Sequence, residues 1–183
     1  ATEIPVRNLA SFIAAISLRI DYFHNAGCRI SDHGPVEIVY RPLTDEQANA
    51  LFVARLEREL THTEMQAWNS VMLIKLAALY KQKAWAMQIH FGALRNNNVR
   101  QYHAIGINSG FDSIADQENL AASLNALLNA MAENNGLPKT IIYNLNASYN
   151  DIVASALANF QNGDDGIKSP MQLGSGWWFN DTH

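Results

Sequence analysis

Apolar residues recur at spacings of three and four along much of the chain, the pattern of helices that bury one face. The helices predicted in this way cover residues 6–25, 45–60, 61–83, 116–134 and 148–160. Thr44 precedes the second of them. Thr61, followed three residues later by Glu64, precedes the third, and both threonines are typical N-caps. We interpret Ser148 with Asp151 as the cap of the last helix.

Between these helices lie short segments rich in β-branched and aromatic residues, which favour strands. The predicted strands are residues 28–31, 85–91, 140–145 and 171–173, and a long loop is predicted over 95–111. Strands that alternate with helices indicate parallel, right-handed crossovers. The predicted fold class is therefore α/β, with residues 1–183 forming a single domain.

The last predicted strand has no covering helix after it, and about four strands are present. A parallel sheet is normally buried on both faces and needs its edges protected. We therefore interpret the chain as part of a larger (β/α)8 TIM barrel, with about half of the strands. The first residue is not Met, which fits a chain that begins inside a longer one.

Composition narrows the classes of function. Apolar residues make up 48% of the chain and charged residues 16%, which is typical of a globular core. The net charge is −4 and no basic cluster is present, so nucleic-acid binding is not expected. No apolar run reaches the ~18 residues of a membrane span, and residues 1–8 lack the features of a signal peptide. Cys28 is the single cysteine, which excludes an intrachain disulfide and suggests a reducing compartment, the cytoplasm.

Polar side chains stand at the end of each predicted strand. Asp32 and His33 follow the first strand, and His90 closes the second. Because the carboxyl ends of parallel strands meet at one edge, we expect these three residues to share a site. A histidine titrates near neutrality and can pass protons, and an aspartate can orient it. His33 taken alone would more simply be a histidine in a turn.

Arg95 and Asn96 come just after the second strand, in the run RNNN, and Trp177 and Trp178 follow the last strand. A planar guanidinium among amides suits a carboxylate with neighbouring hydroxyls. Paired aromatics can face the apolar side of a sugar ring. The alternatives are a surface arginine, a turn formed by asparagines, and tryptophans that simply pack the rim. No strand-end His-x-His pair is present, so no metal ligands are predicted in this chain.

Five motifs together resemble the uronate (glucuronate) isomerase family. They are GCRISDHG, MQIHFGALRNNN, NSGFDSIAD, LPKTIIYNLN and MQLGSGWWFND, and they span nearly the whole chain. The resemblance implies an amidohydrolase-type barrel. It also implies interconversion of D-glucuronate with D-fructuronate, and of D-galacturonate with D-tagaturonate, in bacterial hexuronate catabolism.

By this resemblance, Asp32, His33 and His90 act in catalysis, and Arg95, Asn96, Trp177 and Trp178 bind the open-chain sugar acid. Family members are longer and hold a divalent metal, usually zinc, through a first-strand His-x-His and a last-strand Asp. Neither element exists in this sequence. The 183 residues alone are therefore expected to lack the metal and isomerase activity.

Two alternatives to a uronate isomerase remain at this point. One is a metal-dependent hydrolase on the same type of barrel. The other is a non-catalytic half barrel that associates with itself, because open strand edges and an apolar interior favour pairing with a second copy. A homo-oligomer is expected on the same grounds.

Overall fold

A four-stranded parallel sheet forms the centre of the computed structural model, which describes residues 2–133, 135–161 and 169–176. The strand order is β1-β2-β5-β6, and each neighbouring pair is parallel. The strands are β1 (Ile30–His33), β2 (Ala86–Phe91), β5 (Lys139–Asn144) and β6 (Met171–Leu173). The prediction of parallel strands alternating with helices is confirmed.

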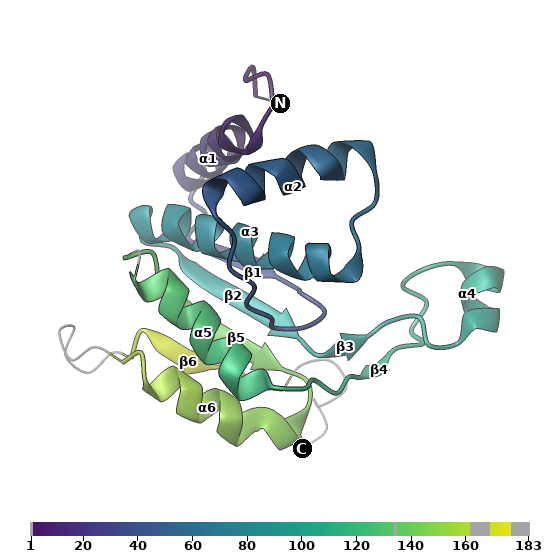
Figure 1. Ribbon diagram of the computed structural model, residues 1–183. Helices are drawn as coiled ribbons and strands as arrows, with labels where there is room; N and C mark the ends of the chain where they lie inside the picture. Colours follow the sequence, from purple (N-terminus) through teal and green to yellow (C-terminus); the bar gives the residue numbers. More distant parts are fainter. Residues whose placement is uncertain (1, 134, 162–168, 177–183) are drawn as a thin grey trace.

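Helices lie on one side of this sheet (Figure 1). They are α1 (Leu9–Asn25), α2 (Asp45–Glu57), α3 (His62–Gln82), α5 (Leu120–Glu133) and α6 (Asn150–Ala158). Thr44 and Thr61 form the capping boxes of α2 and α3, with Gln47 and Glu64 as the reciprocal partners. No helix in the described part of the chain is long and apolar enough to cross a membrane.

The core lies between the sheet and α3, α5 and α6. On β2, Met87, Ile89 and Phe91 are buried, and Ile142 of β5 is fully buried beside them. The alternate residues of both strands are only partly buried. Successive side chains of a strand point to opposite faces, so the sheet has a helix-facing side and a second side, here called the inner face. In a closed barrel, the inner face points to the barrel axis.

Several predicted boundaries are wrong by a few residues, and one shift affects the site. β1 begins at Ile30 and includes Asp32 and His33, which were expected to follow the strand. α5 begins at Leu120 because Asn119 has a φ of 53°, outside the helical region. Ser148 does not cap α6. Its backbone N–H instead donates to the Asn146 side chain, which caps the short 3₁₀ helix η1 (Ala147–Tyr149).

The predicted loop over 95–111 is wrong, because this region contains a helix. A short antiparallel ribbon of β3 (Ala93–Leu94) and β4 (Ser113–Ile114) carries α4 (Val99–Ile105), and Figure 1 shows this arm projecting away from the sheet. Asn98 caps α4 by accepting from the Gln101 backbone N–H. None of the α4 residues is buried. A helix of this length, without an apolar face against the core, leaves no periodic signal in the sequence.

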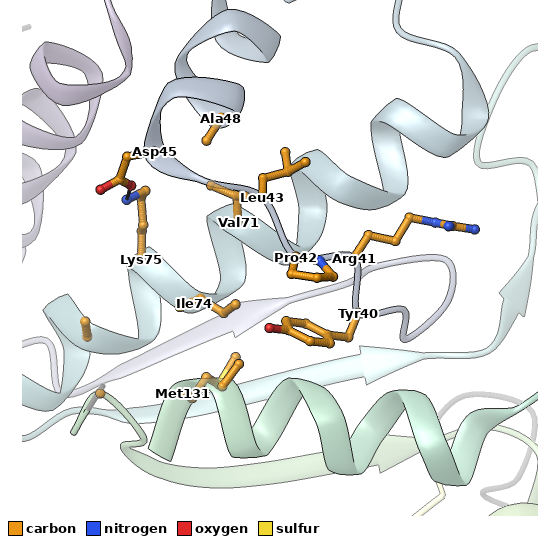
Figure 2. Close-up of a pocket in the computed structure, with 13 residues that line it drawn as sticks. Tyr40, Arg41, Pro42, Leu43, Asp45, Ala48, Val71, Ile74, Lys75 and Met131 are labelled. Atoms are coloured by element: carbon orange, nitrogen blue, oxygen red, sulfur yellow. Dashed lines mark hydrogen bonds and ion pairs between the residues drawn. The ribbon is translucent and has the colours of Figure 1, made fainter. Parts of the chain in front are cut away.

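The irregular segment of residues 34–44 crosses the helix layer beside a cavity of about 440 Å³ (Figure 2). The Tyr40 side chain lines this cavity together with Ile74 of α3 and Met131 of α5. At its edge the Lys75 ammonium pairs with the Asp45 carboxylate at 3.0 Å. The cavity lies among the helices, on the side of the sheet away from the inner face.

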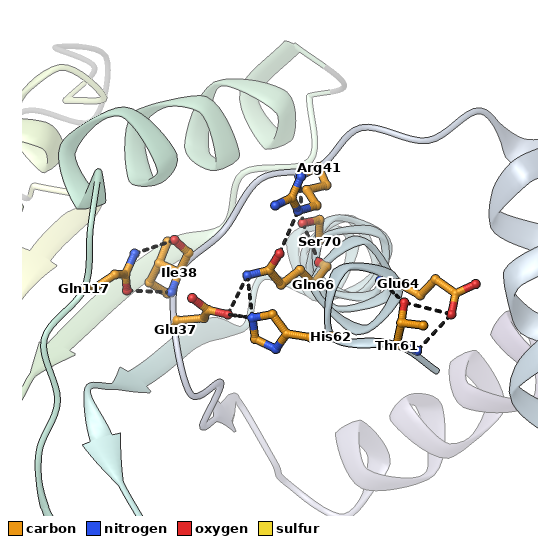
Figure 3. Close-up of polar contacts among 9 residues, drawn as sticks. All are labelled: Glu37, Ile38, Arg41, Thr61, His62, Glu64, Gln66, Ser70 and Gln117. Atoms are coloured by element: carbon orange, nitrogen blue, oxygen red, sulfur yellow. Dashed lines mark hydrogen bonds and ion pairs between the residues drawn. The ribbon is translucent and has the colours of Figure 1, made fainter. Parts of the chain in front are cut away.

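Side chains complete the backbone hydrogen bonds of this segment (Figure 3). The Gln117 side chain accepts from Ile38 N–H at 2.9 Å and donates to Ile38 C=O at 2.6 Å. The Ser70 hydroxyl donates to Val39 C=O and accepts from Arg41 N–H, at 2.8 and 3.0 Å. Buried backbone groups need such partners, so these contacts fix a segment that has no secondary structure of its own.

Candidate functional site

The strand register brings four polar side chains to the inner face, near the carboxyl ends of β1, β2 and β5. Asp32 stands opposite Gln88, and His90 stands opposite Tyr143. Gln88 and His90 are two residues apart on β2, so both point to the same side. The inner face at this end of the sheet is therefore polar, in contrast to the apolar helix-facing side.

Asp32 and His90 are in direct contact. The His90 Nδ1 lies 2.6 Å from the Asp32 Oδ1, and the side chains are 20% and 60% exposed, respectively. An ionised carboxylate can only accept, so Nδ1 carries the proton in this pair. In the neutral imidazole the basic lone pair is then on Nε2. The sequence predicts that these two residues share one site, and the structure places them in contact.

Tyr143 stacks on His90. Their ring centroids are 4.1 Å apart and the rings are inclined by 6°. The Gln88 Nε2 donates to the Tyr143 hydroxyl at 2.6 Å. Neither Tyr143 nor Gln88 is among the site residues predicted from the sequence. The period-two spacing of Gln88 and His90 was the available signal that both face the same way.

His33 does not join this group, contrary to the expectation that it shares the site with Asp32 and His90. Because β1 continues through residues 32 and 33, the two side chains point to opposite faces. The His33 ring packs against Tyr80 of α3, with centroids 5.6 Å apart. Its buried Nε2 has no hydrogen-bond partner among the described residues. Burial lowers the pKa of His33, and the nearby Asp32 carboxylate opposes this effect more weakly.

The lowered pKa of His33 predicts an acid-sensitive fold. In the unfolded chain His33 takes up a proton near pH 6.5, whereas in the folded chain it does so only at lower pH. Its contribution to stability is therefore complete above pH 6.5 and is lost as the pH falls through the folded value. We expect H33N to flatten the fall in unfolding free energy between about pH 7 and about pH 5, measured by urea denaturation. H103N, at an exposed position of α4, should keep the wild-type profile.

Arg95 is held by a carboxylate that the sequence reading missed. The Arg95 Nη1 lies 3.0 Å from the Asp112 Oδ2, and the Asp112 side chain is only 3% exposed. The Asp112 Oδ1 accepts from the Asn96 backbone N–H at 2.7 Å. Asn96 has a φ of 58°, a conformation that asparagine tolerates better than most residues. One buried carboxylate thus fixes both Arg95 and the backbone turn after it.

Trp177 and Trp178 lie outside the described residues, so their expected place at the rim stays a prediction. Among the residues that the structure describes, no group of three or more His, Cys, Asp or Glu side chains could hold a metal ion. Asp32 and His90 are bound to each other, and His33 faces the helices. These side chains do not fit a metal centre by themselves.

The whole chain, residues 1–183, matches the family described as glucuronate isomerase. The uronate isomerase of Staphylococcus haemolyticus is 48% identical over 97% of this chain and 38% of its own length. That of Shouchella clausii is 44% identical over 100% of this chain and 38% of its own length. The chain therefore spans less than half the length of these curated relatives.

Solved structures agree with the sequence matches. The uronate isomerase of Thermotoga maritima superposes with a TM-score of 0.81 at 25% identity, over 96% of this chain and 37% of that one. The glucuronate isomerase of Caulobacter crescentus gives a TM-score of 0.77 at 28% identity, over 93% of this chain and 34% of that one. The fold is thus a partial barrel of the type found in these enzymes. Together with the match along all 183 residues, this places the chain in the glucuronate isomerase family.

Proposed function

We propose that this chain forms the sugar-acid-binding part of a uronate isomerase, which interconverts glucuronate with fructuronate and galacturonate with tagaturonate. The observation that carries the proposal is the 2.6 Å contact between Asp32 and His90 at the carboxyl end of the sheet. Aldose–ketose isomerisation moves a proton between C1 and C2 and between the two oxygens bound to them. A histidine whose tautomer is fixed by a carboxylate is suited to such transfers.

In this proposal Arg95 binds the carboxylate of the substrate. Its guanidinium is already oriented by Asp112 and is 46% exposed, so its planar fork can meet a second carboxylate. His90 contacts the reacting hydroxyls, and Asp32 orients His90. Asn96 lies beside Arg95 in the same turn, and Trp177 and Trp178 would face the sugar ring. His33 would act indirectly, from the helix-facing side of β1.

Uronate binding by the 183-residue chain tests this function. We expect D-glucuronate and D-galacturonate to shift the NMR signals of His90 and Arg95, with D-glucose as a control that lacks the carboxylate. R95M should weaken uronate binding about tenfold or more, because a hydrogen bond to a charged group contributes about 1.5–3 kcal/mol. R100M, at an exposed arginine of α4, is the matched control.

Equal responses to glucuronate and glucose, or an unchanged affinity in R95M, would contradict this assignment. Turnover is a separate readout. We expect none from this chain alone, because the family's metal ligands are expected on parts of the barrel that this sequence does not contain. Isomerisation of glucuronate by the isolated chain at the rate of a complete relative would contradict that expectation.

We further infer a cytoplasmic, self-associating protein that uses a divalent metal, zinc by resemblance, in its complete form. Support for self-association comes from the sheet, whose outer strands β1 and β6 each have one unpaired edge within the described residues. Such edges favour pairing with another chain. Sedimentation velocity measures this association directly, and a monomer at every concentration would speak against it.

A further inference from the structure

The Tyr143 ring has close neighbours from both adjoining strands' sides. His90 of β2 stacks on it at a centroid distance of 4.1 Å. Gly174, which follows β6 on the other side of β5, lies against the ring, because a Cβ built at this glycine would overlap the ring atoms Cδ1, Cε1 and Cγ of Tyr143. The Gly174 backbone is itself fixed, since its N–H donates to Ile142 C=O at 2.8 Å. One stack is thus formed by His90 of β2, Tyr143 of β5 and Gly174, the residue that follows β6.

We propose that Tyr143 is a positioning residue for His90 and that Gly174 is the glycine this role requires. The Asp32 carboxylate fixes the Nδ1 end of the imidazole through one contact of 2.6 Å. The parallel Tyr143 ring, inclined by 6°, lies face to face with the imidazole and so restrains the plane of that ring.

The backing by Gly174 gives the stack its rigidity. Aromatic pairs are individually weak, about 0.5–1.5 kcal/mol beyond their buried area, and a ring with no second neighbour could tilt away from its partner. Gly174 limits that movement by its close approach to the ring. Any side chain at position 174 must push Tyr143 towards His90 or out of the stack. This assigns a function to one glycine of the GSG run that precedes the tryptophans.

The inference rests on the proposed function for its meaning, because the fixed imidazole is the one expected to handle the substrate protons. Its geometry can nevertheless be tested without substrate. In the full 183-residue chain, the ring protons of His90 should be shifted upfield by the Tyr143 ring current. The nitrogen NMR shifts of the imidazole should report the tautomer with the proton on Nδ1.

Four variants separate the roles of the Tyr143 ring, its hydroxyl and the glycine at position 174. Y143L removes the ring, and G174A displaces it, so both should abolish the upfield shift and mix the tautomers. Y143F keeps the ring and loses only the hydroxyl, so the shift should persist. G34A is the matched glycine control, because a Cβ there would meet nothing closer than His90 C=O at 4.0 Å, an ordinary contact. Methyl signals of the α5 leucines report whether each variant is folded.

Glucuronate affinity should fall about tenfold or more in Y143L and G174A and stay near wild type in Y143F and G34A. The proposal is overturned if the upfield shift persists in both Y143L and G174A, or if the shift is lost with no change in affinity. Should G174A fail to fold, Y143L against Y143F decides the same question. A wild-type chain that binds no uronate would refute the proposed function while leaving the comparison of imidazole geometry intact.

Discussion

Replacing Asp112 with alanine is expected to destabilise the β3–β4 ribbon and to weaken uronate binding together. The Asp112 side chain is 3% exposed and serves two donors, the Arg95 guanidinium and the Asn96 backbone N–H. Removing a buried carboxylate that accepts two such hydrogen bonds costs about 1–3 kcal/mol. Without the carboxylate, Arg95 loses its fixed orientation, and we expect the affinity for glucuronate to fall about tenfold or more. Urea denaturation and calorimetric titration measure the two effects.

D112N is the control for charge. It keeps an acceptor for the Asn96 N–H and removes the ion pair with Arg95, so its stability should lie between that of wild type and that of D112A. Its affinity for glucuronate should fall as well, because a neutral amide holds the guanidinium less firmly. If D112A binds glucuronate as tightly as wild type, the carboxylate does not position Arg95 for the ligand.

The second large effect is expected at the centre of β5. Ile142 is fully buried between the sheet and the helices, whereas Ile141, its neighbour in sequence, faces the partly exposed inner face. Truncating a buried isoleucine to alanine removes buried methyl groups and leaves a cavity, at a cost of about 2–5 kcal/mol. We expect I142A to reduce the unfolding free energy by an amount in this range.

I141A is the matched control, because it is the same substitution in the same strand. It should reduce the unfolding free energy much less, because its site is already partly in contact with water. Equal losses for I141A and I142A would mean that the inner face is covered in solution, as it would be if a second copy packed on it. Chemical denaturation of both variants at several protein concentrations distinguishes the two cases.

Much of the fold follows from the sequence because its strong signals are local. The apolar period of the helices, the capping pairs at Thr44 and Thr61, and the β-branched run in β5 all depend on neighbouring residues. The parallel sheet then follows from the alternation of helices and strands. The contact between Asp32 and His90 was predictable by the same route, since both stand at the carboxyl ends of parallel strands.

The remaining features depend on register and on distant partners. Asp32 faces the site and His33 the helices because both lie inside β1, which ends two residues later than predicted, and no local signal sets that boundary. Asp112 lies 17 residues from Arg95, and their pairing needs a ribbon whose strands are two residues each. The stack of His90, Tyr143 and Gly174 joins β2, β5 and the segment after β6, so it exists only once the sheet has formed.

Successive side chains of β2 and β5 point alternately to the inner face and to the helices, and this has a consequence for how such proteins diversify. Gln88, His90 and Tyr143 can be exchanged without changing the volume packed beneath the helices, because Met87, Ile89 and Ile142 fill that space independently. Substitutions at the inner-face positions can therefore change ligand selectivity, while the buried helix-facing residues maintain the thermal stability of the fold. Libraries for redesign should randomise the inner-face positions and leave the buried helix-facing positions unchanged.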